Sequence, residues 1–242
     1  MCSNIAVTVK HPRRKRKPPL ALFAGLAALC LSGCADFGGP RVKDTSRTFN
    51  TVVIDAGHGG YDSGTRSRWG GREKDSTLDV ALRLDPKVRA AGFQTVLTRR
   101  TDTFIELNER AAISNRQDNA VFVSIHFNDS PKRAISGTEV YYKSSVSRPL
   151  AERILAKVSA LPGDHGRFVK IANFRVLRLN EYPAVLVECG YLSNRSEGAR
   201  DATPAHHERL EQSSVLEVPN FRVQCDSLRE PFWLMQRVSL VR

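Results

Sequence analysis

Three short apolar runs rich in β-branched residues constrain the fold of this chain more than any other feature. The runs are residues 51–56, 120–125 and 183–187. Each is followed by a potential catalytic or metal-binding residue: His58 in a glycine-rich turn, His126 and Glu188. Runs of this length and composition predict buried strands. The carboxyl ends of parallel strands meet at one edge of an open α/β sheet, where such folds place their sites. We therefore predict a single α/β domain with an open, mostly parallel twisted sheet and helices on both faces.

Further helical and strand patterns fill the rest of the chain. The predicted elements are a helix over 76–91, a strand over 93–98, a helix ending near 116, a strand over 138–142 and helices over 149–161 and 204–215. Asp75 is a candidate N-cap for the first helix. Pro86 predicts a kink or a break near Asp85, because proline lacks a backbone donor and clashes with the preceding turn. Thr103 and Glu106 have the spacing of a capping box for the second helix.

Three residues are of the types that bind a catalytic zinc ion: His58, Glu73 and His126. Two neutral imidazoles and one carboxylate leave a fourth tetrahedral position for water and make a positive site that acidifies it. A carboxylate outside this set, Glu188, could accept the water proton and return it to a leaving amine. Singly, each residue also has an ordinary explanation, such as a hydrogen-bonded structural histidine or a glutamate that complements a helix dipole. The set as a whole favours metal-dependent hydrolysis.

Six motifs surround these residues, at 53–60, 72–75, 97–99, 107–111, 123–128 and 186–194. In sequence and order they resemble those of the zinc-dependent N-acetylmuramoyl-L-alanine amidases of catalytic type 3. This resemblance implies that His58, Glu73 and His126 hold one Zn2+ per chain and that Glu188 is the catalytic glutamate. It also implies hydrolysis of the amide between N-acetylmuramic acid and the L-alanine of the stem peptide in peptidoglycan.

Two other functions fit parts of the sequence. A catalytically inactive wall-binding lipoprotein could keep the fold, but Glu188 and the complete ligand set argue against it. A zinc peptidase or deacetylase acting on another exported substrate would use the same zinc chemistry. Glu73 as a ligand and the glycine-rich turn fit the amidase pattern better.

Four further residues are candidates for roles beside the metal or the substrate. Asp55, Asp62 and Ser124 could orient the histidines, since they lie close to them in the sequence. Asp62 is more typical of a turn residue. Asn128 follows His126 by two residues and would share its side of the strand, where it could contact substrate or belong to a turn.

The first 33 residues have the composition of an export signal. They contain a basic block at 10–17, an apolar run at 20–31 that is too short to span a bilayer, and no acidic residue. Residues 31–34, Leu-Ser-Gly-Cys, resemble the bacterial lipoprotein cleavage motif. This resemblance implies a signal peptide over 1–33, a lipid on Cys34 and anchoring at the periplasmic face of the outer membrane. Ordinary secretory cleavage nearby, with Cys34 free, is the alternative.

Removal of this leader changes the meaning of the net charge. It takes away six Lys and Arg residues and no acid, so the formal charge falls from +12 to +6. The basic block serves export, and we do not expect nucleic-acid binding. The modest positive charge that is left suits an anionic wall polymer, and peptidoglycan is the expected partner.

The remaining segments predict a monomer with one catalytic domain. Residues 34–49 form a tether, residues 50–217 the amidase domain and residues 218–242 an atypical C-terminal tail outside the resemblance. The stretch 129–137, with Lys132 and Arg133, is too short for an inserted regulatory helix, so we expect a site that needs no activator protein. Cys189 and Cys225 could form a disulfide, but we favour two thiols.

Overall fold

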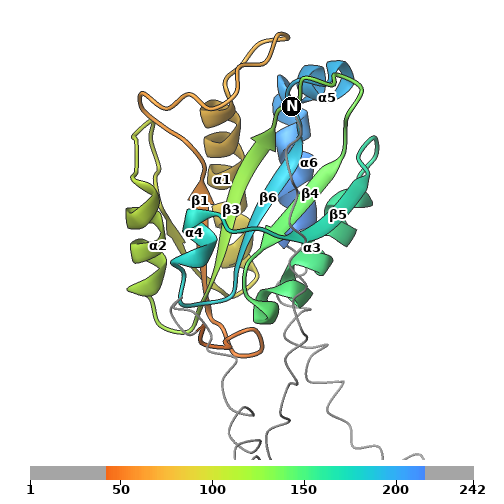
Figure 1. The fold of residues 1–242 in the computed structure, drawn as a ribbon. Coiled ribbons are helices and arrows are strands. Elements are labelled where there is room, and N and C mark those ends of the chain that lie inside the picture. Colours follow the sequence, from red (N-terminus) through yellow and green to blue (C-terminus); the bar gives the residue numbers. More distant parts are fainter. Residues whose placement is uncertain (1–41, 216–242) are drawn as a thin grey trace, which may run out of the picture. The chain divides into compact units, whose positions relative to one another are not determined.

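A computed structural model describes residues 42–215 of the protein, which build an open sheet of six strands with helices on both faces (Figure 1). Across the sheet the order is β2 (Gln94–Leu97), β1 (Thr51–Ala56), β3 (Ala120–Asn128), β6 (Ala184–Tyr191), β4 (Thr138–Tyr142) and β5 (Gly166–Ile171). Neighbouring strands run parallel except β4 and β6, which are antiparallel. The predicted fold class is confirmed.

The helices divide between the two faces of the sheet. One face, here called the α1 face, carries α1 (Glu73–Ala90), α3 (Arg148–Ser159) and α6 (Pro204–Val215). The opposite face, the α2 face, carries α2 (Leu107–Asn115) and the short α4 (Arg175–Arg178). The remaining helices are α5 (Arg195–Asp201), which lies next to α6, and the 3-10 turn η1 (Ser145–Ser147), which precedes α3.

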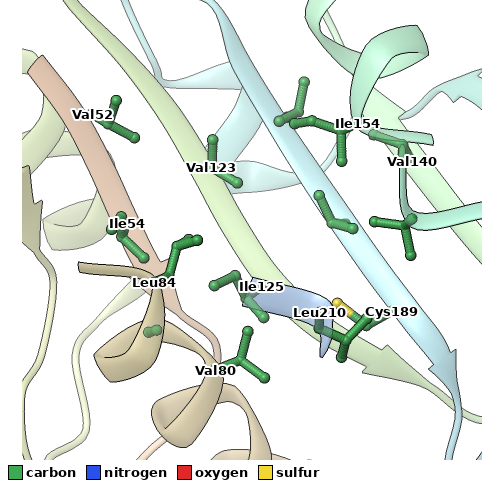
Figure 2. Close-up of a cluster of buried hydrophobic side chains, with 14 of the residues drawn as sticks. Val52, Ile54, Val80, Leu84, Val123, Ile125, Val140, Ile154, Cys189 and Leu210 are labelled. Carbon is green, nitrogen blue, oxygen red and sulfur yellow. The ribbon is translucent and has the colours of Figure 1, made fainter. Parts of the chain in front are cut away.

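Both faces of the central strands are buried, which explains their continuous apolar sequences. Successive side chains of a strand point to opposite faces. Val52 and Ile54 therefore pack into the larger core on the α1 face, whereas Val53 packs into the smaller core on the α2 face. Figure 2 shows the larger core, where Val80 and Leu84 of α1 meet the strands. Full burial of one aliphatic side chain contributes about 1.5–3 kcal/mol, so these runs hold the sheet between its helices.

The start of α1 is set by a loop and not by the predicted N-cap. The helix begins at Glu73, with Arg72 at the N-cap position and no side-chain cap. The backbone amides of Glu73 and Lys74 donate to the carbonyls of Thr65 and Ser63 over 2.9 and 3.2 Å. Because these carbonyls satisfy the first helical amides, no capping side chain is needed. The prediction of Asp75 as N-cap is wrong.

Pro86 does not break α1, which is continuous from Glu73 to Ala90. Leu84 and Val88, on either side of the proline, are buried in the larger core. An interior proline costs about 3 kcal/mol, whereas the burial of these two side chains together contributes about 3–6 kcal/mol. Tertiary packing therefore outweighs the local preference, and the break that we predicted near Asp85 does not form.

The capping box predicted for α2 does not form either. The helix begins at Leu107, and its N-cap residue Glu106 makes no side-chain cap. The Thr103 hydroxyl instead lies 2.9 Å from that of Thr101. The segment before α2 therefore remains non-helical, and part of it lines the cleft described below.

Residues just before the predicted domain boundary at residue 50 contact the domain. The amide of Lys43 donates to Glu181 over 2.7 Å, and the fully buried Phe49 stacks on Phe93 with ring centroids 5.2 Å apart. The last residues of the predicted tether over 34–49 thus pack against the domain. The sequence patterns also missed β5, α4 and α5.

Some predictions concern residues outside the described part of the chain. These are the signal peptide over 1–33, the lipid site Cys34, the tail over 218–242 and Cys225. Between residues 42 and 215, the structure has no helix that combines the length and apolarity needed to cross a membrane.

Candidate functional site

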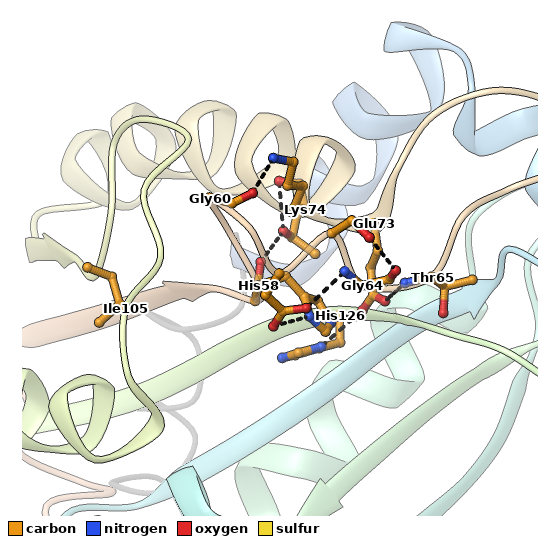
Figure 3. Close-up of polar contacts among 12 residues, drawn as sticks. His58, Gly60, Gly64, Thr65, Glu73, Lys74, Ile105 and His126 are labelled. Carbon is orange, nitrogen blue, oxygen red and sulfur yellow. Dashed lines mark hydrogen bonds and ion pairs between the residues drawn. The ribbon is translucent and has the colours of Figure 1, made fainter.

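Three potential metal ligands meet at the carboxyl ends of β1 and β3. His58 follows β1, Glu73 begins α1 and His126 lies near the end of β3 (Figure 3). Glu73 Oε1 lies 3.0 Å from His58 Nε2 and 3.0 Å from His126 Nδ1. Within residues 42–215 this is the one group of His, Cys, Asp and Glu residues suited to a metal, with its ligand atoms within 4.8 Å of one another. The chain leaves β1 for β2 on one side and has β3 on the other, so the group lies at a topological switch point of the sheet.

An unusual backbone conformation turns His58 toward Glu73. The φ angle of His58 is 60°, in the left-handed region, which costs a non-glycine residue on the order of 1 kcal/mol or more. Arg110 Nη2 donates to the His58 carbonyl over 2.7 Å, and Asp62 Oδ2 lies 2.8 Å from His58 Nδ1. Because Asp62 engages Nδ1, Nε2 is the nitrogen left for a metal.

Asp62 combines the two roles between which the sequence left a choice. Its backbone closes a turn with Gly59, with amide-to-carbonyl distances of 2.9 and 3.1 Å. Its carboxylate orients His58 and also accepts the amide of Gly64 over 3.1 Å. The turn interpretation alone was therefore incomplete.

Two glycines give the ligands their space. A Cβ atom at Gly57 would collide with the imidazole of His126, and one at Gly64 would lie 2.6 Å from Glu73 Oε2. Gly64 also has a φ of 60°, which a side chain rarely adopts. The glycine-rich segment after β1 is thus required by close packing around the ligand set.

Hydrogen bonds and charge hold Glu73 ionised in a nearly buried position. Its Oε1 accepts the amide of Phe127 over 3.0 Å, and its Oε2 accepts the amide of Thr65 over 2.9 Å. Burial acts to raise the pKa of Glu73, but His126 and His58 outweigh it and hold that pKa far below its usual range. Burial likewise acts to lower the pKa of His58, but Glu73 and Asp62 outweigh it, and the net direction is upward.

This ligand set fits a divalent cation of the zinc type. Two imidazole nitrogens and one carboxylate oxygen are common catalytic zinc ligands with bonds of about 2.0–2.2 Å. The two separations of 3.0 Å between ligand atoms suit such bonds to one ion. The carboxylate is already ionised, as a ligand must be.

Glu188 lies beside the ligand set and has an oxygen to spare. It is in register with His126 across β3 and β6. Its Oε2 is buried and has no hydrogen-bond partner in the described part of the chain. Burial, opposed by the charge of His126 and reinforced by Glu73 and Glu139, raises the pKa of Glu188 to about 7. A carboxylate with such a pKa can both accept and return a proton near neutral pH.

A cleft of about 470 Å³ opens over these residues on the α2 face. His58, His126 and Glu188 line it together with the segment before α2 and with α4. The walls are mostly apolar with a few polar groups, as is usual for binding sites of small molecules and polymer segments. The lining outside the ligand set consists of Asp55, Asp62, Phe104, Ile105, Glu106, Leu107, Arg110, Phe174, Arg175, Val176 and Leu186.

Asp55 and Ser124 do not orient the histidines. The Ser124 hydroxyl donates to Asp55 over 2.6 Å, and the other Asp55 oxygen accepts from Thr98 and Arg110 over 2.7 and 2.9 Å. Asp55 is fully buried, and its pairing with Arg110 satisfies both charges. The two residues therefore support His58 indirectly, through Arg110.

Two buried arginines are functional neighbours that the sequence analysis did not single out. Arg110 donates to the carbonyls of Ala56 and His58 over 2.6 and 2.7 Å, and Arg99 Nη2 donates to that of Gly57 over 2.9 Å. Together they hold three consecutive carbonyls at the end of β1. Both lie in motifs that carried the family resemblance, and that was the only signal available for them.

Asn128 and the loop after it lie at the other side of the site. Asn128 Nδ2 donates to Glu139 over 3.2 Å, and the register shifts between His126 and Asn128. Contact of Asn128 with substrate stays a prediction. In the loop, Arg133 pairs with Asp129 at 3.7 Å on the surface.

Cys189 is a buried free thiol, and burial raises the pKa of this thiol well above its usual value.

Comparison with known proteins identifies the family. Residues 52–217 match the family model described as N-acetylmuramoyl-L-alanine amidase. The chain belongs to this amidase family. Among its relatives, LytC of Bacillus subtilis, an N-acetylmuramoyl-L-alanine amidase, is 35% identical over 167 residues, which are 67% of this chain and 34% of LytC. This chain therefore matches only about a third of LytC.

Solved amidase structures share the fold over most of the described residues. AmiC2 of Nostoc punctiforme is 35% identical with a TM-score of 0.66, and the match covers 73% of this chain and 97% of AmiC2. The catalytic domain of CwlV from Bacillus (Paenibacillus) polymyxa var. colistinus is 36% identical with a TM-score of 0.67, covering 74% and 99%. The group of His58, Glu73 and His126 is consistent with a metal site of this amidase family.

Proposed function

We propose that this protein is a zinc-dependent hydrolase that cleaves the amide between N-acetylmuramic acid and L-alanine in peptidoglycan. Membership of the amidase family supports the reaction and the substrate. The observation that carries the proposal is the buried, unpartnered Glu188 Oε2 in the same cleft as the ligand set. A structural glutamate would have its oxygens satisfied, whereas an acid–base group must keep one available.

The residues around the cleft divide the chemistry between them. Zinc held by His58, Glu73 and His126 would polarise the scissile carbonyl and lower the pKa of water. Glu188 takes the proton from the attacking water and returns it to the L-alanine nitrogen as the amide bond breaks. Asp62 keeps His58 in the tautomer that ligates through Nε2. The apolar walls limit the access of bulk water, which strengthens these electrostatic effects.

Digestion of purified peptidoglycan tests this function. The zinc-loaded protein should release new amino termini of L-alanine and leave the glycan strands intact. Amino groups of amino sugars would indicate a deacetylase, and termini within the stem peptide would indicate a peptidase. A folded, zinc-loaded protein that releases none of these would exclude the proposed activity and support a wall-binding role.

We also propose that the protein is exported and anchored by a lipid on Cys34. Support comes from the basic and apolar leader and the cleavage motif at residues 31–34. In a Gram-negative host, the full chain should incorporate labelled palmitate and fractionate with the outer membrane. Cys34→Ala should lose the label and become soluble in the periplasm. Equal labelling of both proteins would reject Cys34 as the lipid site.

No activator protein is needed under this proposal. Support comes from the stretch at 129–137 between β3 and β4, which is too short to hold an inserted regulatory helix. The purified protein alone should therefore digest peptidoglycan. Hydrolysis that begins only when a second protein is added would contradict this expectation.

A further inference from the structure

Four residues that are in register cross the sheet from the metal site to the edge of the sheet. In the strand register, His126 of β3 is paired with Glu188 of β6, Glu188 with Glu139 of β4, and Glu139 with Phe168 of β5. Paired residues share one face of a sheet, and adjacent strands lie about 4.8 Å apart. Phe168 therefore lies on the same face as Glu188, on the order of 10 Å from it.

Three aromatic rings lie next to one another near Phe168, at the β5 end of this series. The ring centroid of Tyr141 lies 5.1 Å from that of Phe174 and 6.0 Å from that of Phe168. Phe174 also lines the cleft and is 40% exposed, so this group of rings begins at the cleft wall. On the α2 face, Tyr141 of β4 packs against the cluster that contains Val176 and Leu177 of α4. We call Tyr141, Phe168 and Phe174 the aromatic row.

Glu139 fixes the surroundings of the aromatic row. This carboxylate is 2% exposed and accepts four hydrogen bonds: from the hydroxyls of Tyr141 and Tyr191 and from Arg167 Nε, each over 2.6 Å, and from Asn128 Nδ2 over 3.2 Å. The guanidinium of Arg167 in turn lies 5.6 Å from the centre of the Phe168 ring. Side chains held in this way lose little freedom when a ligand binds.

We infer that the aromatic row binds the glycan strand of peptidoglycan next to the scissile amide. The inference rests on the proposed function and deepens it. The scissile bond joins a polysaccharide to a peptide, so the two parts of the substrate leave the reacting centre in different directions. Flat rings suit the apolar C–H faces of sugar rings, and an exposed apolar surface that continues a cleft commonly marks a binding site.

Arg175 offers a site for the stem peptide next to α2. Two cations flank the aromatic row: Arg167 pairs with Glu139, and Nζ of the exposed Lys170 lies 5.9 Å from the centre of the Phe168 ring. Arg175, by contrast, reaches toward α2, where it bonds Asn108, and has no carboxylate partner in the described part of the chain. Its exposed cation suits the carboxylates of a stem peptide. The aromatic row lies on β4, β5 and the start of α4, and its rings suit the sugar rings.

Binding of the two separated halves of the substrate tests the inference. The zinc-loaded full chain is titrated with peptide-free glycan oligomers and, separately, with a free stem peptide, and each Kd is measured by calorimetry. Phe168→Ala and Phe168→Leu should both weaken glycan binding about fivefold, because stacking on a ring is lost. Phe168→Tyr should retain it. Stem-peptide binding should be unchanged in all three variants.

A matched control lies on the same strand. Ile171 is 59% exposed and points to the opposite face of β5, so Ile171→Ala should change neither Kd. The inference is overturned if the wild-type protein does not bind glycan, if Phe168→Leu binds it as tightly as wild type, or if stem-peptide binding weakens instead. Wild-type release of L-alanine termini is measured in parallel. If the wild type releases L-alanine termini but the Phe168 variants bind glycan as tightly as wild type, only the role of the aromatic row is rejected. If the wild type releases no L-alanine termini, the proposed activity is rejected.

Discussion

At the residue scale, the site depends on the groups that hold its ligands as much as on the ligands. His58 carries an unfavourable φ of 60°. Arg110 holds its carbonyl and Asp62 holds its Nδ1. The cost of the conformation is thus offset by a charged hydrogen bond on each side. Sequence proximity suggested Asp62 as a partner of the histidines but could not identify Arg110, which is 52 residues away.

The first prediction concerns Glu188. Glu188→Gln should keep one zinc ion per chain but lower kcat at least about a hundredfold, because an amide cannot accept the water proton. Zinc content by atomic absorption and release of L-alanine termini provide the two measurements. Glu152→Gln, on the exposed side of α3, is the matched control and should leave both unchanged. Loss of zinc from Glu188→Gln would show that the base and a ligand have been exchanged in our assignment.

The second prediction concerns Asp62. Asp62→Asn should weaken zinc binding about 10- to 100-fold, because the carboxylate no longer fixes the tautomer and orientation of His58. Competition with a fluorescent zinc chelator measures the affinity. The exposed Asp118→Asn removes the same charge away from the site and should bind zinc like wild type. Equal affinity in all three proteins would reduce Asp62 to the turn residue that its sequence context indicates.

At the element scale, the helices are where local signals and tertiary contacts disagree. The start of α1 is decided by carbonyls of the preceding loop, and its continuity through Pro86 by the buried neighbours Leu84 and Val88. Neither effect is visible in a local sequence window. The consequence is functional, because the observed start makes Glu73 the first residue of the helix and aims it at the histidines.

The third prediction concerns the attachment of α6. His207 of α6 lies between Asp79 of α1 and Asp201 of α5, with nitrogen-to-oxygen distances of 2.6 and 2.9 Å. Burial acts to lower the pKa of His207, but the two carboxylates outweigh it and raise that pKa above its ordinary value. A raised folded-state pKa gives stability that is complete below the unfolded pKa of about 6.5 and is lost as pH rises through the folded pKa.

Chemical unfolding at two pH values tests this attachment. His207→Gln should lower the free energy of unfolding by about 1–2 kcal/mol below about pH 6 and by less at about pH 9. The difference between wild type and variant at each pH isolates the contribution of His207. A difference that grows with pH would have the wrong sign and would reject the assignment.

At the scale of the whole molecule, the core and the site occupy opposite sides of the sheet. The larger core lies on the α1 face, whereas the cleft opens on the α2 face under the shorter helices α2 and α4. The ligand set stands at the carboxyl edge between them. We therefore expect the core to hold the domain together without a metal. The helices on the α2 face are shorter and leave the cleft accessible.

The fourth prediction concerns metal removal. Chelation should abolish hydrolysis and lower Tm while leaving the sheet and helices folded. A metal at a concentration about 100-fold above its Kd stabilises the folded state by about 2.7 kcal/mol. Far-UV circular dichroism and thermal unfolding before and after chelation make the comparison, and added zinc should restore both Tm and activity. Loss of secondary structure on chelation would show that the metal is needed for folding.

The sequence alone determined the α/β class, the three central strands and the candidate residues His58, Glu73, His126 and Glu188. Their signals are local, since β-branched runs predict buried strands and parallel strands bring their carboxyl ends together. The tertiary structure alone decided how these residues are held and surrounded. The antiparallel β4, the edge strand β5, the roles of Arg110 and Glu139 and the aromatic row all depend on contacts between distant segments, and no local pattern records such contacts.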